Sequence, residues 1–143
     1  MRTDDDPPPT KFVATKEAIR VAAFRSALRE FLRASEELAR ANGLTPRRHQ
    51  LLLMIKGAPD GSERASIGEL VDRLRLAQTT VTELVQRAVE AGLVERERSA
   101  SDGRVISLHL SAEGERRLAR VFQSHETERE KLRAVLDESQ PTL

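Results

Sequence analysis

The chain has 143 residues, which gives room for one domain, and it contains no cysteine, so disulfides and thiolate metal sites are excluded. No apolar run approaches the roughly 18 residues that a membrane span requires, and we expect a cytoplasmic protein without a membrane part. Its 24 basic and 23 acidic residues leave a net charge of +1, whereas a domain whose whole surface binds phosphate is usually more basic. Any nucleic-acid function must therefore rest on a local pattern.

The N-terminal segment is acidic and rich in proline, and it lacks the apolar core of a signal peptide. We expect residues 1–12 to form a disordered tail in front of a folded domain that spans 13–138. The first helix is predicted over 16–42, where apolar residues recur at three- and four-residue spacing. Asn42-Gly43 ends this helix, because glycine freely takes the left-handed cap conformation.

Helix-start signals mark two short helices after this point. Thr45 is a good cap, and Pro46 suits the first helical position because its missing N–H needs no partner there. Ser66 and Glu69 form a capping box, in which each side chain bonds a free backbone N–H at the start of the next helix. That helix is predicted to run to Leu74.

A further helix is predicted from Gln78 to Ala91, after a short break at 75–77. Its apolar stripe consists of Val81, Leu84, Val85, Ala88 and Val89. This stripe packs against the preceding helix in the predicted arrangement, so that the polar face remains free.

The hydrophobic period then changes from about four to two, which predicts a hairpin of strands 94–98 and 104–110 around a turn at 99–103. Ser111 is expected to cap one long terminal helix over 112–138. The sequence therefore predicts a mainly α fold with a small β-hairpin. Its centre is a winged helix-turn-helix over 45–110, flanked by the long terminal helices at 16–42 and 112–138.

The free face of the helix 78–91 carries side chains that suit the major groove of B-DNA. Gln pairs bidentately with adenine, and Thr offers a hydroxyl to any base and a methyl to thymine. Alone, such a helix start is more simply a solvated surface, but the hairpin behind it favours DNA binding. The candidate DNA-binding residues are Ser66, Gln78, Thr79, Thr80, Thr82, Gln86, Arg87, Arg98, Ser101, Asp102 and Arg104.

The hairpin tip holds a second signal. Asp102 and Arg104 are two residues apart, so they point the same way, and the carboxylate can orient the guanidinium by paired hydrogen bonds. An arginine held at a wing tip can enter a narrow minor groove. In isolation, a surface salt bridge worth ~0–1 kcal/mol is the simpler interpretation.

At this point the sequence resembles the MarR family of transcriptional regulators. Residues 102–111 are similar to that family's wing signature, which is Asp, any residue, Arg and then alternating apolar residues ending in Leu-Thr/Ser. Gly114 follows where the family usually has glycine. Segments 67–74 and 80–96 resemble its helix-turn-helix, Leu44-Thr45-Pro46 and 51–53 resemble its second helix, and the resemblance covers about 16–138.

The resemblance implies a homodimeric repressor that binds a pseudo-palindromic operator in double-stranded DNA, with the first and last helices forming the interface. It also implies a cleft between these dimerisation helices and the DNA-binding module, where a small aromatic or anionic effector binds. Arg47, Arg48 and His49 are candidates for that cleft, although a solvated helix start explains the arginines more simply. His49 is equally consistent with a partly exposed helix residue. No cofactor and no metal are expected.

The sequence departs from the family pattern in three places. Arg75 stands where the turn usually has glycine, which predicts a less tight turn, and Ala77 replaces the usual Ser/Thr cap, which weakens the helix start by ~0.5–2 kcal/mol. Segment 77–110 carries four arginines against five acidic residues, a net charge of −1. The terminal helix also ends early for this family, which predicts a small dimer interface.

The sequence bears on two other classes of function, an enzyme and a protein-interaction module. The three histidines, His49, His109 and His125, have no metal-ligand spacing, and the chain has neither a glycine-rich phosphate loop nor a nucleophile elbow, so an enzyme is not expected. His125 lies on the apolar stripe of the last helix and is interpreted as a satisfied interface residue. A winged-helix protein-interaction module without a DNA role is the alternative, because of the local net charge of −1.

Overall fold

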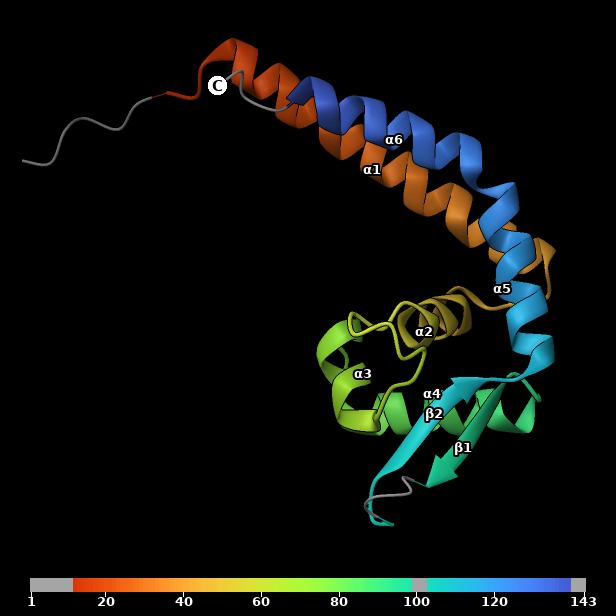
Figure 1. Ribbon diagram of the computed structural model, residues 1–143. Coiled ribbons are helices and arrows are strands. Elements are labelled where there is room, and N and C mark those ends of the chain that lie inside the picture. The colour runs from red at the N-terminus through yellow and green to blue at the C-terminus, as the bar shows by residue number, and fades with distance from the viewer. Residues whose placement is uncertain (1–11, 99–102, 140–143) are drawn as a thin grey trace, which may run out of the picture.

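The computed structural model of the protein describes residues 12–98 and 103–139, which are mainly helical with one small hairpin (Figure 1). The fold class expected from the sequence is confirmed. The expected disordered tail lies outside the described residues except for Phe12, whose side chain is fully exposed. In chain order the elements are α1 (Thr15–Ala41), α2 (Pro46–Lys56), α3 (Ile67–Leu74), α4 (Gln78–Glu90), β1 (Val94–Arg98), β2 (Ile106–Leu110), α5 (Ala112–Ser124) and α6 (Glu126–Ser139).

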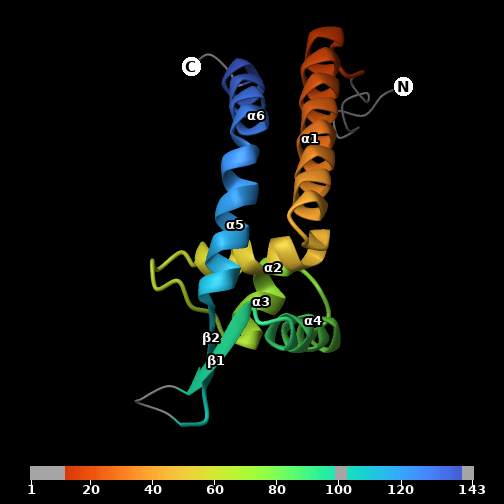
Figure 2. The same cartoon turned by 90° about the vertical axis from the view of Figure 1, so that its right-hand side faces the viewer.

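The molecule has two parts. Helices α2, α3 and α4 and the hairpin form a compact module, while α1 and α6 lie along each other and form an arm that projects away from it (Figures 1 and 2). Helix α5 leads from the hairpin to α6 and contacts α1 and α2 on the way. The arm and the module are therefore joined at two places, the α1–α2 turn and the α5–α6 junction.

Helix α2 is the centre of the core. It contacts α1, α3, α4, α5 and β2, and the side chains of Leu51, Leu52 and Ile55 have no exposed surface. Its start follows the prediction, since the Thr45 hydroxyl accepts a hydrogen bond of 3.2 Å from the Arg48 N–H. Because α2 is covered on several sides, the module is built around it rather than beside it.

The hairpin is antiparallel and pairs Val94 with Leu110 at one end and Arg98 with Ile106 at the other. Strand β2 is shorter than predicted, because β1 ends at Arg98 and the residues before Ile106 have no strand partner within the described residues. Ala65 forms an isolated β-bridge to the other edge of β2, exchanging backbone hydrogen bonds of 3.0 and 2.8 Å with Leu108. The segment before α3 is thereby fastened to the wing.

The prediction of one long terminal helix is wrong, because α5 and α6 are separate helices with a break at His125. The Ser124 hydroxyl donates to the Arg120 carbonyl, a local bond that often bends helices. The Arg129 guanidinium donates to the Phe122 carbonyl and lies over its ring, 3.7 Å from the centroid. A side chain thus satisfies a carbonyl at the end of α5 that a continuous helix would satisfy with a backbone N–H.

Gly114, in the first turn of α5, allows this helix to start directly against the hairpin. The glycine is buried, and a Cβ built on it would overlap the backbone carbonyl of Leu93. Ser111 stabilises the same contact between the start of α5 and the hairpin. Its hydroxyl donates to the Gly92 carbonyl at 2.6 Å and accepts from the Gly114 N–H at 3.0 Å.

We therefore predict that Gly114→Ala lowers the free energy of unfolding by about 1–3 kcal/mol, the usual cost of overpacking. Denaturant titration measures this change. Gly68→Ala is the matched control, because Gly68 is also in the first turn of a helix and an added Cβ would come no closer than 4.0 Å to the Ser66 Oγ. The control is expected to be neutral or stabilising by up to about 1 kcal/mol; equal losses in both variants would contradict this account.

Candidate nucleic-acid interface

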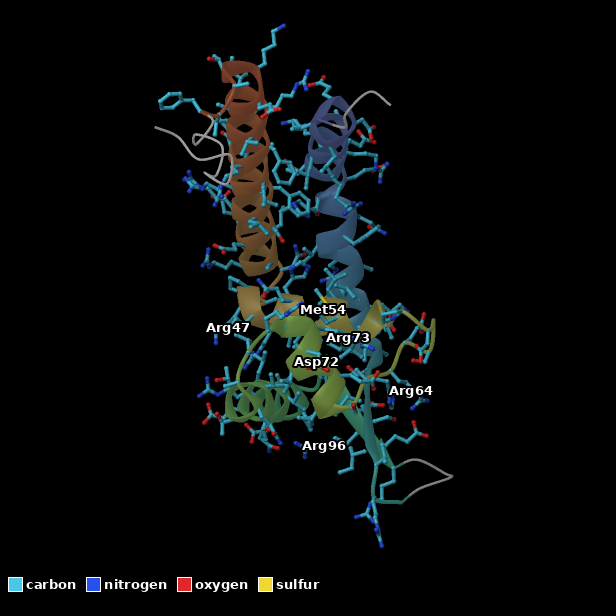
Figure 3. All side chains as sticks on the ribbon, turned by 90° about the vertical axis from the view of Figure 1, so that its left-hand side faces the viewer. Arg47, Met54, Arg64, Asp72, Arg73 and Arg96 are labelled. Carbon is cyan, nitrogen blue, oxygen red and sulfur yellow. The ribbon has the colours of Figure 1, made fainter. Side chains whose placement is uncertain are left out.

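The capping box at the start of α3 is confirmed. The Ser66 N–H donates to the Glu69 carboxylate at 3.0 Å, and the Glu69 N–H donates to the Ser66 hydroxyl at 3.2 Å. Arg73, at the other end of α3, donates to Glu69 at 2.9 Å and to the Met54 carbonyl at 3.2 Å (Figure 3). Helix α3 is thereby capped on itself and fastened to α2.

The turn between α3 and α4 keeps a tight geometry, so the predicted loosening at Arg75 is wrong. Arg75 itself takes the left-handed conformation, with φ 57° and ψ 39°, and its N–H bonds the Val71 carbonyl at 3.0 Å. A residue with a side chain costs roughly 1–2 kcal/mol in this conformation. The arginine therefore keeps the turn that glycine would make, at the cost of backbone strain.

Helix α4 is rotated by its packing so that one polar face is free. Val81, Val85 and Ala88 are buried with at most 1% exposure. The predicted residues on the free face are all exposed, namely Gln78, Thr79, Thr82, Gln86 and Arg87, whereas Thr80 is half-buried at the edge of this face. At 100° per residue, Gln78, Thr79, Thr82 and Gln86 lie within about a quarter of the helix circumference.

The start of α4 has no side-chain cap, as the sequence predicted from Ala77. The backbone N–H groups of a first helical turn have no intrahelical partner and are the positive end of the helix dipole. They point outward beside Gln78 and Thr79, which gives this end of α4 affinity for an anionic oxygen.

One member of the predicted set, Gln86, is bonded inside the protein. Its amide N–H donates to the Glu90 carboxylate at 2.9 Å, and its amide oxygen accepts a hydrogen bond from the Arg96 guanidinium. Arg96 lies on β1, and Figure 3 shows it beside α4. Arg96 is not among the residues predicted from the sequence, because no local pattern reveals a bond between a strand and the preceding helix.

The two faces of the wing differ in charge. In the hairpin register Arg96 and Arg98 alternate with Glu95 and Glu97, so that they lie on opposite faces. His109 lies on the acidic face, with its Nε2 2.9 Å from the Glu95 carboxylate. The net charge of −1 over residues 77–110 is thus unevenly distributed. The arginines of β1 share one face of the strand, which lies on the side of α4.

The acidic face is also partly neutralised from outside the hairpin. Arg64, in the segment before α3, forms an ion pair with Glu97. This guanidinium lowers the pKa of the Glu97 carboxyl below its ordinary value.

The wing tip is only partly described. Arg98 and Arg104 are exposed, whereas Ser101 and Asp102 lie outside the described residues, so the predicted pairing of Asp102 with Arg104 stays a prediction. Val105 and Ile106, next to Arg104, are 46% and 43% exposed.

The three candidate effector residues are not brought together in one cleft. Arg47 is exposed, Arg48 is half-buried and His49 is buried. His49 lines a small pocket of about 90 Å³ between α1 and α2, whose other lining residues are Leu32, Ser35, Glu36, Pro46 and Gln50.

A pocket of about 320 Å³ lies instead between α2 and α5, at the boundary of arm and module. Leu53, Leu118 and Phe122 give it an apolar wall, and Lys56 lies at its edge. The ammonium group of Lys56 is 2.9 Å from Glu63 and 3.0 Å from Glu115, and these hydrogen bonds raise its pKa above the ordinary value. The lysine is therefore charged but already paired.

Over the residues that the structure describes, no cluster of three metal-ligating side chains occurs. In the same ranges no helix is both long enough and apolar enough to span a membrane.

The capped helix, tight turn, exposed second helix and hairpin together define a winged helix-turn-helix protein. Residues 42–105 match the MarR family model. The match covers the winged helix-turn-helix and less than half of the chain, so the chain is similar to the MarR family in that region.

Two proteins of Bacillus subtilis (strain 168) are similar in sequence. The uncharacterized HTH-type transcriptional regulator YsmB is 42% identical over 57 residues, which are 40% of this chain and 39% of that protein. The HTH-type transcriptional repressor YetL is 31% identical over 83 residues, 58% of this chain and 48% of that protein. The chain thus spans less than half of the length of either relative.

Solved structures share the fold at lower identity. A MarR family protein from Bacillus stearothermophilus superposes with a TM-score of 0.71 at 23% identity, over 82% of this chain and 79% of the other. Sco3205, a MarR family transcriptional regulator from Streptomyces coelicolor solved in complex with DNA, gives 0.63 at 19% identity, over 96% and 82%. The likeness extends to both the arm and the module.

The strain at Arg75 gives a direct test of the turn. Arg75→Gly is expected to raise the free energy of unfolding by up to about 1 kcal/mol, because the relief of strain exceeds the added freedom of the unfolded chain. Arg75→Ala is the control, since it removes the side chain but keeps the Cβ that causes the strain. Denaturant midpoints compare the two, and an equal change in both variants would show that the turn is unstrained.

Proposed function

We propose that the protein is a transcriptional regulator that binds double-stranded DNA as a homodimer on a pseudo-palindromic operator. One observation carries this proposal: the free polar face of α4, with an uncapped start, lies on the same side as the arginine face of the wing. A helix of this kind fits the major groove while the wing follows the neighbouring backbone or minor groove. The function is binding, without a catalytic step.

The contacts differ in kind along this surface. Gln78, Thr79 and Thr82 are placed to contact base edges, because they lie in the first turns of α4. Arg98 and Arg104 are placed to contact phosphate or a narrow minor groove. Phosphates carry no information about the base sequence, and the minor groove carries only a degenerate pattern. The Gln86 side chain is bonded within the protein, to Glu90 and Arg96, so it supports the surface rather than contacting bases.

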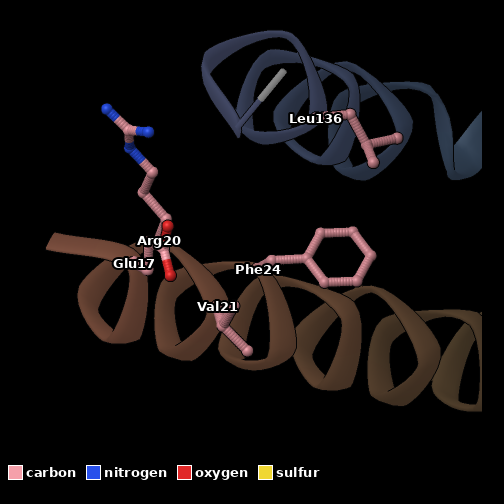
Figure 4. A pocket seen from close by; sticks show the side chains of 5 residues that line it. All are labelled: Glu17, Arg20, Val21, Phe24 and Leu136. Carbon is pink, nitrogen blue, oxygen red and sulfur yellow. The ribbon is translucent and has the colours of Figure 1, made fainter. Parts of the chain in front are cut away.

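Exposed apolar side chains on the arm support the proposed dimer. Ile19, Val21 and Leu32 on α1 are 62%, 57% and 47% exposed, and Leu136 on α6 is 42% exposed. Phe24 and Leu136 face each other across an open pocket of about 430 Å³ near the end of the arm (Figure 4). Apolar surface of this extent on two helices favours association with a second copy.

Two finer points belong to the same proposal. The named repressor YetL is 31% identical over 83 residues, and we propose that this protein also represses. The apolar pocket between α2 and α5 is the place that we propose for a small effector, because a ligand there would contact arm and module at once.

The alternative, a protein-interaction module, predicts no DNA binding at low salt.

Selection from a random pool of DNA tests the proposal. The purified full chain is expected to enrich fragments with two inverted half-sites, and log K against log salt is expected to fall linearly as phosphate contacts release counterions. Failure to enrich any sequence, together with no binding at low salt, would favour the alternative.

Two substitutions separate the two kinds of contact. Gln78→Ala is expected to cost about 1–3 kcal/mol of binding and to relax preference at one position of each half-site. Arg104→Ala is expected to weaken binding to all sequences and to reduce the salt slope by about 1 for each chain, with the dimer intact by light scattering. Arg116→Ala on α5, an exposed arginine paired with Glu113, is the control; unchanged affinity in the Arg104 variant would overturn the wing assignment.

A further inference from the structure

Two of the three histidines are the buried polar side chains of the described core. His49 is 7% exposed and His125 is 5% exposed. They come from different elements, His49 from α2 and His125 from the α5–α6 junction, and a charge on His125 lowers the pKa of His49. The third histidine, His109, lies apart from them on the wing.

The pair lies between the arm and the module. The His125 ring stacks on Phe31 of α1 with 4.4 Å between centroids, and its Nε2 is 3.3 Å from the Phe31 carbonyl. His49 faces α1 from α2, where it lines the small pocket with Leu32 and Glu36. One imidazole thus belongs to the module and the other to the break in the arm, and α1 touches both.

The break at His125 separates α5 from α6. The His125 N–H is shared between the carbonyls of Val121 and Phe122, at 3.0 and 3.3 Å. Beyond it, α6 is fastened to the end of α5 through the Arg129 side chain. The Arg129 N–H also bonds the His125 carbonyl at 3.1 Å, so a few backbone bonds and one side chain hold the break.

The charged groups around the pair compensate a positive charge only in part. Glu36 faces it from α1, and Glu128 and Arg129 face it from α6. Among the described residues, neither imidazole lies within ion-pair distance of a carboxylate, whereas His109 does. Arg129 opposes a positive charge on His125 and Glu128 favours it.

Both rings are therefore harder to protonate than a free histidine. Burial lowers the pKa of His49, and the proximity of His125 lowers it further. Burial also lowers the pKa of His125, against a smaller opposing effect of the Phe31 carbonyl. Since the folded chain takes up these protons later than the unfolded chain, the pair's contribution to stability is complete above about pH 6.5 and is lost as the pH falls below it.

We propose that His49 and His125 form a proton-sensitive joint that sets the angle between the α1–α6 arm and the DNA-binding module. When both imidazoles are charged, their repulsion and their burial favour a state in which α2 and the α5–α6 junction separate. In a dimer, a change of this angle moves the two α4 helices relative to each other, so DNA binding weakens at acidic pH. That last step rests on the proposed function, whereas the joint itself does not.

The joint is tested first without DNA. The chain has no cysteine, so Asp72→Cys on α3 and Arg133→Cys on α6, both exposed, accept spin labels selectively. Diluted with unlabelled protein, the labelled chain is expected to change its label distance by about 2 Å or more between about pH 7.5 and about pH 5.5. His49→Gln/His125→Gln is expected to abolish the change, and His109→Gln is expected to retain it.

An unchanged distance in the parent chain, or an equal change in the double variant, overturns the joint. If the double variant does not fold, titration of the imidazole protons in the unsubstituted chain by NMR decides. The rings of His49 and His125 are expected to titrate below about pH 6.5, and ordinary midpoints for these two rings overturn the proposal.

DNA affinity at the two pH values separates the joint from the proposed function. Weaker binding at the lower pH in the parent and in His109→Gln, but not in the double variant, supports both. A distance change in a protein that binds no DNA at either pH supports the joint and overturns the proposed function.

Discussion

The burial of Val81, Val85 and Ala88 fixes the rotation of α4 about its own axis, and the candidate interface depends on that rotation. A helix with three buried positions at this spacing can expose only one side. Helix α2 provides the surface against which α4 is buried, because Leu51, Leu52 and Ile55 fill the centre of the module. The core thus determines which face of α4 is exposed. Substitutions on this polar face therefore do not move the helix.

The wing is held to this core by backbone contacts. Ala65 pairs with Leu108 across the edge of β2, and the start of α5 lies against Leu93 because residue 114 is glycine. Arg96 then joins the wing to α4 through Gln86. Helix and wing therefore form one body, with the arginines on one face of β1 and the glutamates on the other. This separation explains how a chain with a net charge of +1 can present a local basic surface.

Local signals were predicted well because their causes are local. The caps at Thr45 and Ser66 and the stripe of α4 depend on residues within one or two turns. The break at His125 was missed, because it depends on a bond from Arg129 back to a carbonyl, which the apolar period does not record. The turn at Arg75 was misjudged, because the sequence shows a missing glycine but not the strain that the surrounding packing sustains. Arg47, Arg48 and His49 differ in burial although they are neighbours on one short helix, and of the three only His49 lines the small pocket between α1 and α2, which the sequence pattern does not record.

Hydroxyl-radical footprinting of the selected DNA tests the central claim most directly, because it reports where the free face of α4 lies. The account predicts two protected segments whose major-groove centres lie ~34–36 Å apart, or a multiple of that, on one face of the duplex. Substitution of Gln78 should alter the cleavage pattern at the centres, and substitution of Arg104 should alter it at the flanks. A single protected segment, or centres that do not respond to Gln78, would contradict the account.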